Sequence, residues 1–247
     1  MAVEIKEITK MNVDHPILVE GFPGVGMIGT AATMYLTNEL KMQLCGYVDS
    51  DRFPPFCTIH NGIPLPPARI YCSEKYNMLA ILSEFAIPLA VVHETCSKII
   101  EFSKQKEARM IYSLGGINLK VREEEIDNVY GVGTTLISQQ LLEKNNVTVI
   151  KEGVTTGVTG VLLAECFAEN YPAISLLTPS RPLAIDLMSA AAVLNVFCKM
   201  ENIPLSTDKL VKEGLAIENK LRDLMKNAKD AKERYTKIEG SSGPTYR

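Results

Sequence analysis

Hydrophobic residues along the chain fall into short apolar runs that alternate with longer stretches in which apolar positions recur every three or four residues. The runs predict buried strands, and the stretches predict amphipathic helices. The expected strands are residues 16–20, 44–48, 56–59, 68–72, 78–82, 110–114, 147–150 and 174–177, and the expected helices are residues 27–40, 91–105, 133–144, 158–168 and 182–200.

This order of elements predicts the fold class. Strands that alternate with helices of about 10–15 residues are typical of a sheet covered by helices on both faces. The four expected strands between residues 44 and 82 follow one another without a helix, which indicates some antiparallel pairing. We therefore expect a three-layer α/β/α sandwich with a mixed sheet, formed by one core domain over residues 1–203.

The last forty residues have a different pattern. Their apolar and small residues are spaced alternately by four and three positions, at Leu210, Gly214, Ile217, Leu221, Leu224, Ala228, Ala231 and Tyr235. This spacing predicts a long C-terminal heptad helix over residues 204–238. The stripe either packs along its own domain or forms an oligomer seam centred on Ile217, Leu221 and Leu224. Residues 239–247, rich in glycine and serine, are expected to be a flexible tail.

Composition narrows the function classes. The 247 residues are 46% hydrophobic with a net charge of −3, which is typical of a folded globular protein. Residues 1–205 carry 16 basic against 22 acidic side chains, an acidic surface that argues against nucleic-acid binding. No apolar run reaches the roughly 18 residues of a membrane span. The cysteines lack CxxC spacing and predict reduced core residues of a cytoplasmic protein; they are Cys45, Cys57, Cys72, Cys96, Cys166 and Cys198.

One glycine-rich turn is a possible ligand loop. Gly24, Gly26 and Gly29 match the GxGxxG pattern between an expected strand and helix, and Asp49 lies 20 residues after Gly29. In dinucleotide-binding folds such glycines admit the pyrophosphate, and the acid binds the ribose. The alternative is a turn whose glycines let helix and strand pack closely. A second such turn, residues 152–160, can hold an anion or supply Thr155 or Thr156 as a helix N-cap.

Catalytic and metal-binding patterns are weak. No GxSxG motif is present, and no serine or cysteine stands beside a histidine, so we predict no catalytic residue. His93 and Cys96, spaced i and i+3, could supply two ligands, which do not make a metal site. Arg181 and Asp186 are interpreted as surface charge and helix capping. We expect no metal and no cofactor.

Four segments together resemble a known family. They are Glu20–Gly29, Arg52–Phe56, Gly62–Tyr71 and Gly153–Gly160. In order and spacing they resemble the proteasome assembly chaperone family, in its archaeal-type members, over about residues 15–225. The resemblance implies a core similar to nucleoside phosphorylases but without their active site, no enzymatic activity, and homo-oligomers. It also implies a partner, the 20S proteasome or its α subunits.

The resemblance assigns a role to the tail. Members that act on the proteasome dock between its α subunits through a C-terminal motif of a hydrophobic residue, tyrosine and any residue. Here the corresponding residues are Thr245, Tyr246 and Arg247, with threonine at the hydrophobic position. We therefore expect a non-enzymatic proteasome assembly chaperone or proteasome-binding adaptor that docks through this tail. The alternative is a nucleotide or small-ligand-binding enzyme that uses the Gly24–Gly29 loop.

Overall fold

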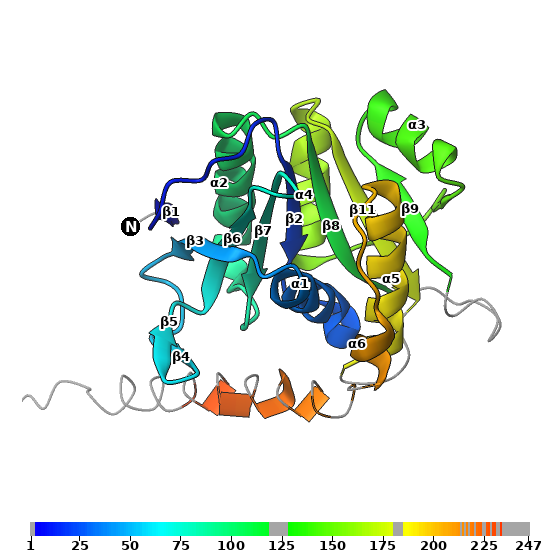
Figure 1. Cartoon of the computed structure of the whole chain (residues 1–247). Helices are drawn as coiled ribbons and strands as arrows, with labels where there is room; N and C mark the ends of the chain where they lie inside the picture. The colour runs from blue at the N-terminus through cyan, green and yellow to red at the C-terminus, as the bar shows by residue number, and fades with distance from the viewer. Residues whose placement is uncertain are drawn as a thin grey trace, which may run out of the picture.

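The structure is a computed structural model that describes residues 3–118, 128–179 and 185–212, together with some of the positions between 214 and 233. These residues form a large mixed sheet with helices packed against both of its faces (Figure 1). The three-layer α/β sandwich expected from the sequence is therefore confirmed. Its likeness to nucleoside phosphorylases stays an expectation.

The described part of the sheet contains nine strands. In spatial order they are β1 (Glu4–Glu7), β3 (Gln43–Asp49), β6 (Ala68–Ser73), β7 (Met78–Ser83), β2 (Ile17–Gly21), β8 (Met110–Ile117), β11 (Ala173–Pro179), β9 (Tyr130–Gly133) and β10 (Thr148–Val149). Strand β2 is parallel to its neighbours β7 and β8, and β8 is parallel to β11. The pairs β1–β3, β3–β6, β6–β7 and β9–β11 are antiparallel, so the sheet is mixed as predicted.

Helices on the two faces enclose two hydrophobic cores. The α-helices are α1 (Ile28–Glu39), α2 (Val92–Gln105), α3 (Leu136–Lys144), α4 (Gly157–Ala168), α5 (Leu187–Met200) and α6 (Asp208–Lys212). Helices α1 and α5 pack together on one face, and α2 and α4 pack together on the other. Because both faces are covered, every residue of the central strands β2 and β7 is buried.

Three short strands are absent from the prediction. Strands β1 and β9 lack an apolar run, and β5 (Ile63–Leu65) contains Pro64. Strand β5 pairs with β4 (Thr58–His60) in a separate two-stranded hairpin. Helix α3 begins at Leu136, later than predicted, because Thr135 and Ser138 form a capping box there.

The prediction that all six cysteines are reduced is wrong for two of them. Cys45 on β3 and Cys72 on β6 form a disulfide, with their Cα atoms 6.0 Å apart. They are separated by 27 residues in sequence, but the antiparallel pairing of β3 with β6 brings them together. Cys96, Cys166 and Cys198 are free and buried, and Cys57 is free and exposed.

The C-terminal segment packs against the core where it is described. The described positions between 214 and 233 are helical, and the helix over residues 204–238 stays a prediction. Leu210 and Leu221 are almost fully buried and belong to the core on the α1 and α5 face. Ile217, Leu224 and the tail residues Thr245, Tyr246 and Arg247 lie outside the described residues, as does Arg181.

Candidate functional site

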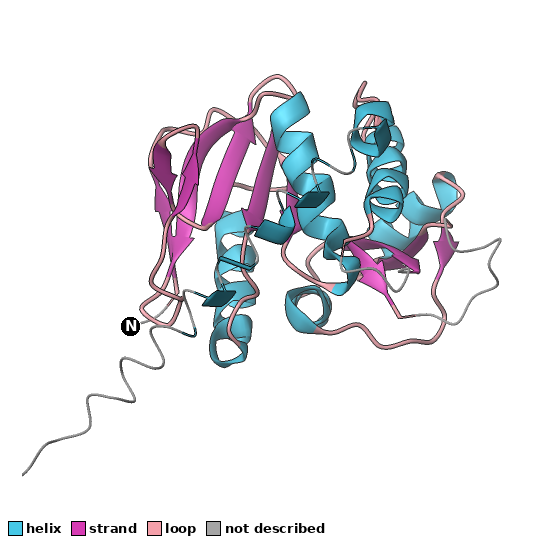
Figure 2. Ribbon diagram, turned by 90° about the horizontal axis from the view of Figure 1, so that it is seen from below, coloured by secondary structure: helices cyan, strands magenta, loops and turns pink. Residues whose placement is uncertain are grey.

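The candidate site lies where β2 and β8 end. These two strands are neighbours and run parallel, so their carboxyl ends meet at one edge of the sheet; Figure 2 looks onto this edge. After β2 the chain passes through α1 to β3 on one side of the sheet, and after β8 it continues to β9 on the other side. In open α/β sheets, ligands bind at such a point of reversal.

The first glycine-rich turn connects β2 to α1. A Cβ atom on Gly29 would lie 2.1 Å from the carbonyl oxygen of Leu114, so the glycine permits α1 to contact β8 directly. Gly26 has a φ of 63°, a conformation that glycine adopts without strain. Gly24 has an extended backbone, and a Cβ atom added there would meet nothing within 4 Å. Packing and backbone conformation therefore account for Gly26 and Gly29, but not for Gly24.

The second glycine-rich turn faces the first one. Together they enclose a cavity of about 620 Å³, lined by the first turn, the end of β8, residues 153–157 and Thr159. Thr156 is the N-cap residue of α4, as the sequence predicted, but its side chain makes no capping hydrogen bond. The fold thus places the two turns, which are more than a hundred residues apart in sequence, on opposite sides of one cavity.

A buried carboxyl group lies next to this cavity. Glu20 on β2 is 1% exposed; its Oε1 accepts a hydrogen bond from the Phe22 amide at 2.7 Å, and its Oε2 accepts one from Ser113 Oγ at 2.5 Å. Ser113 Oγ also lies 3.0 Å from the hydroxyl of Thr159, which lines the cavity. Burial raises the pKa of Glu20 to about 7, although the hydrogen bonds from Ser113 and Phe22 favour the ionised form.

The structure does not bring Asp49 to the ligand loop. Asp49 ends β3, and β6 and β7 lie between β3 and β2, a separation of roughly three strand spacings or about 14 Å. Its carboxylate accepts a hydrogen bond from Lys6 Nζ at 2.7 Å. Gly24, Gly26 and Gly29 therefore lie together in one turn, but the acid that a dinucleotide site needs is not near it.

The remaining polar residues singled out from the sequence have structural contacts. Asp186 is the N-cap of α5, and its Oδ1 accepts a hydrogen bond from the Ser189 amide at 3.0 Å, which confirms the capping role. His93 is exposed, with Nδ1 3.1 Å from Glu165 Oε1, whereas Cys96 is buried. Their i and i+3 spacing therefore does not direct the two side chains to a common point.

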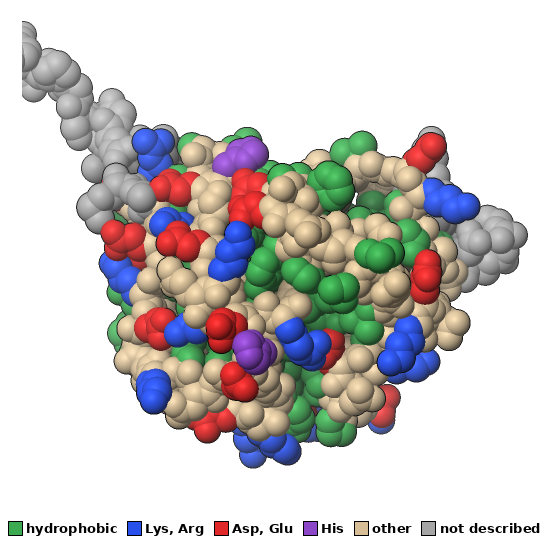
Figure 3. Space-filling model, turned by 90° about the horizontal axis from the view of Figure 1, so that it is seen from above, with side chains coloured by type: hydrophobic (Ala, Val, Ile, Leu, Met, Phe, Trp, Pro, Cys, Tyr) green, Lys and Arg blue, Asp and Glu red, His purple; other side chains and the backbone are tan. Residues whose placement is uncertain are grey.

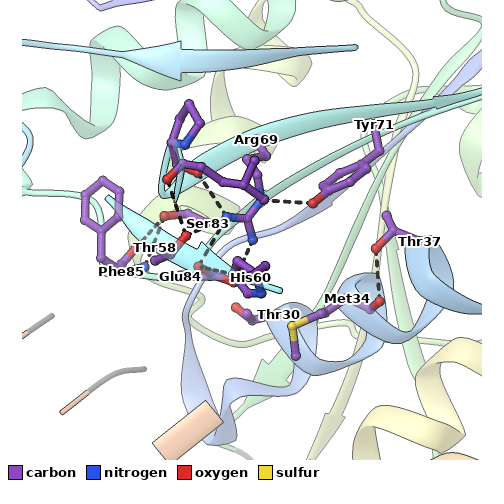
Figure 4. Close-up of polar contacts among 12 residues, drawn as sticks. Thr30, Met34, Thr37, Thr58, His60, Arg69, Tyr71, Ser83, Glu84 and Phe85 are labelled. Carbon is purple, nitrogen blue, oxygen red and sulfur yellow. Dashed lines mark hydrogen bonds and ion pairs between the residues drawn. The ribbon is translucent and has the colours of Figure 1, made fainter. Parts of the chain in front are cut away.

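A second polar cluster holds the β4–β5 hairpin against the sheet. Arg69 on β6 lies between Tyr71 on one side and Thr58, His60 and Glu84 on the other (Figure 4). Arg69 Nη2 donates to Glu84 Oε1 at 2.6 Å, and Arg69 Nη1 donates to Thr58 Oγ1 at 2.9 Å. His60 Nε2 lies 2.9 Å from Glu84 Oε1. These contacts tie β4 to the sheet end.

Arg69 and Glu84 are a buried ion pair, with side chains 2% and 1% exposed. Burial pushes the pKa of Glu84 upward, but the hydrogen bonds and charge of Arg69 outweigh it and hold that pKa below its usual value. The same partner keeps the pKa of Arg69 above its usual value despite burial. Both groups therefore stay charged inside the protein, and the pair supports the hairpin rather than a reaction.

Sequence reasoning did not single out Glu20 or Glu84 as site residues. Glu20 lies near the end of a strand that is otherwise apolar, and a carboxyl group in such a run indicates a buried acid.

Asn61 and Gly62, both with positive φ, form the two-residue turn between β4 and β5. Asn-Gly is the strongest short-range signal of a hairpin, and it marks this hairpin in the sequence.

The opposite edge of the sheet looks different. Seen from above, acidic and basic side chains are interspersed on this face, and hydrophobic side chains gather to the right of its centre (Figure 3). The described residues form no continuous basic surface on this face. Within the described part of the chain, every helix is too short or too polar to cross a bilayer.

Comparison with known proteins decides the family. A model of the PAC2 family matches residues 18–225. The chain belongs to the PAC2 family. This match confirms the family expected from the two glycine-rich turns and the proline-rich segments. The chain is also 31% identical over 225 residues to the uncharacterized protein MJ0106 of Methanocaldococcus jannaschii, covering 90% of this chain and 91% of that protein.

Solved structures of two archaeal proteins share the fold. Pyrococcus furiosus PbaA, described as an archaeal homolog of proteasome-assembly chaperone, has a TM-score of 0.81 and 32% identity, over 92% of this chain and 99% of PbaA. Pyrococcus furiosus PbaB, described as an archaeal proteasome activator, has a TM-score of 0.74 and 24% identity, over 90% of this chain and 98% of PbaB. Because the identity to PbaB is only 24%, this similarity shows a shared fold alone.

Proposed function

We propose that this PAC2-family protein is a non-enzymatic proteasome assembly chaperone or proteasome-binding adaptor. The observation that carries the proposal is the 32% identity to PbaA over 92% of the chain, since PbaA is described as a homolog of a proteasome-assembly chaperone. The partner is the 20S proteasome or its α subunits, and the protein acts in the cytoplasm. The described residues supply a scaffold, and Thr245, Tyr246 and Arg247 are the docking element.

Physical chemistry supports a tail that binds weakly and by several copies. Tyr246 offers an aromatic body with a polar tip, and a terminal carboxylate after Arg247 can pair with a basic residue of a pocket. Thr245 buries less apolar area than leucine would. A homo-oligomer that presents several tails at once compensates for weak single contacts, because the second contact is intramolecular.

Removal of the last three residues tests this proposal. We expect that deletion of Thr245, Tyr246 and Arg247 abolishes co-migration with a cognate 20S particle on a native gel, and that Thr245→Leu strengthens it several-fold. Extension by one glycine after Arg247 displaces the carboxylate and is expected to weaken binding. Ser241→Ala, in the preceding linker, is the matched control and keeps wild-type binding.

Two results would contradict the proposal. If the full-length protein does not associate with the 20S particle or with its isolated α subunits, the proteasome role fails. If association persists after the deletion, the protein binds the proteasome through another surface and only the docking element fails.

A further inference from the structure

The cavity between the two glycine-rich turns has the size and position of a small-molecule site. Its volume of about 620 Å³ lies within the roughly 300–1,000 Å³ of known ligand pockets. It opens at the carboxyl ends of β2 and β8, where the chain reverses direction across the sheet. The described residues that line it carry no charged side chain. Recognition of a ligand in this cavity therefore depends on hydrogen bonds and shape.

Gly24 lines this cavity and is exposed, with open space around its Cα atom. Its φ of −146° and ψ of −157° are extended values that any residue adopts, and an added Cβ would meet nothing within 4 Å. By contrast, a Cβ on Gly29 would collide with the backbone of β8. A larger residue can therefore be introduced at position 24, in the lining of the cavity, without straining the fold.

When Glu20 is neutral, the hydrogen bonds beside the cavity do not use every hydroxyl proton of the three groups that they join. Glu20, Ser113 and Thr159 then carry three protons, and only two hydrogen bonds join them. Because Glu20 Oε1 accepts from the Phe22 amide, its proton sits on Oε2 and is donated to Ser113. Ser113 in turn donates to Thr159. Among the described residues the Thr159 hydroxyl has no other hydrogen-bond acceptor, so its own proton is available to an acceptor in the cavity.

We propose that this cavity binds a small organic molecule with an acidic headgroup, a carboxylate or a phosphate, whose oxygen accepts a hydrogen bond from Thr159. Thr155 and Thr156 line the same cavity and add further hydroxyl donors. The apolar part of the ligand contacts Pro23, Val25 and Val154. This site is separate from the proposed proteasome docking and does not depend on it.

Binding is coupled to the protonation of Glu20. When Glu20 is ionised, the protons of Ser113 and Thr159 both point toward it, and the Thr159 oxygen repels an acceptor. Since the pKa of Glu20 is about 7, above that pH Glu20 must take up a proton from solvent when an ionised ligand binds. Of the elements packed around Glu20, α2 contributes Cys96, whose pKa burial and Glu20 both raise, so it stays neutral. Helix α4 and strand β8 contribute the hydroxyls of Thr159 and Ser113.

Benzoate, phenyl phosphate and benzamide are the probes for this proposal. Benzamide has nearly the shape of benzoate but carries no charge. In NMR titrations of the full-length protein we expect benzoate and phenyl phosphate to shift the amide signals of both glycine-rich turns. Benzamide is expected to bind at least tenfold more weakly. From pH 6 to pH 8 the affinity for benzoate should fall about tenfold, because Glu20 must first take up a proton.

Three variants locate the binding site. Gly24→Leu places a bulky side chain in the lining of the cavity and should weaken binding, and Thr159→Val should weaken binding about tenfold by removing the donor. Glu20→Gln keeps a neutral donor to Ser113, so it should retain binding and lose the pH dependence. Thr148→Val, on the exposed strand β10, is the control and should behave as wild type.

The proposal is overturned by any of three results. One is the absence of binding by benzoate and phenyl phosphate at 10-fold molar excess and millimolar concentration. Another is benzamide binding as tightly as benzoate. The third is binding that Thr159→Val and Gly24→Leu leave unchanged. Thermal unfolding of each variant verifies folding, and if Gly24→Leu does not fold, Thr159→Val and Glu20→Gln decide.

Discussion

At the scale of single residues, the burial of Glu20 makes the stability of the protein depend on pH. It stands among apolar neighbours on a strand that is buried on both faces, and its two oxygens are satisfied by one amide and one hydroxyl. Burial stabilises the neutral acid relative to the carboxylate, and no cation among the described residues contacts Glu20 to compensate the charge. A group of this kind links the stability of the protein to pH.

Replacing Glu20 by glutamine should remove that link. The pKa of the carboxyl is about 7 in the folded protein and 4.5 as a reference value, so the folded state binds the proton more tightly. The resulting stabilisation is complete below about pH 4.5 and is lost as the pH rises to 7, about 3 kcal/mol in total. Urea denaturation at pH 4.5, 6 and 7.5 measures this difference between wild type and Glu20→Gln.

In the difference between the free energies of unfolding of wild type and Glu20→Gln, the contributions of all other titrating groups cancel. We expect the free energy of unfolding of the wild type to fall relative to the variant across this range. Parallel pH profiles of the two proteins would contradict the assignment. Glu101→Gln, at an exposed carboxylate that pairs with Lys98, serves as the control for the mutation itself.

At the scale of elements, the β4–β5 hairpin depends on side chains outside its own two strands. It has two short strands, and isolated two-stranded hairpins are marginally stable in water. The buried pair of Arg69 and Glu84 and the hydroxyl of Thr58 supply the missing contacts. The segment Gly62–Tyr71, which resembles the chaperone family, contains both β5 and the arginine that anchors the hairpin.

Breaking this ion pair should be costly. Glu84→Gln leaves the Arg69 guanidinium buried beside a neutral amide, and removal of one member of a buried pair typically costs 3–5 kcal/mol. We expect a loss of about 3 kcal/mol in the free energy of unfolding, measured in urea. Glu101→Gln should lose less than about 1 kcal/mol because its ion pair is exposed. Similar losses for the two variants would show that the buried pair is not the anchor.

At the scale of the whole molecule, the C-terminal segment packs against the core through buried leucines. Leu221 is 1% exposed in a single chain and belongs to the same core as α1 and α5. This burial favours packing along the chain's own domain, one of the two alternatives that the heptad pattern leaves open. The seam as a subunit contact stays a prediction for Ile217 and Leu224.

Two substitutions at Leu221 separate these alternatives. Leu221→Ala should lower the free energy of unfolding by about 2–5 kcal/mol, the usual cost of truncating a buried leucine. Leu221→Glu should leave the mass measured by light scattering unchanged. Val211→Ala, at a position that is 43% exposed on α6, should change neither quantity measurably. A drop in mass with Leu221→Glu would instead place the seam between subunits.

Local sequence patterns were sufficient to predict most of the strands and helices. An apolar run or a helical stripe reports which side of its own segment is buried, and that information is local. For this reason β2, β7, β8 and α2 appear close to their predicted positions. The strands that were missed, β1, β5 and β9, have no such pattern, because their pairing partners rather than their own side chains determine them.

The sequence by itself also indicated the family and the two glycine-rich turns. Only the tertiary structure decided how distant segments meet. It paired Cys45 with Cys72, separated Asp49 from the Gly24–Gly29 loop, and brought Ser113 and Thr159 to Glu20. These relations follow from the order and direction of strands in the sheet. Long-range backbone pairing sets that order, and the spacing of residues within one segment carries no record of it.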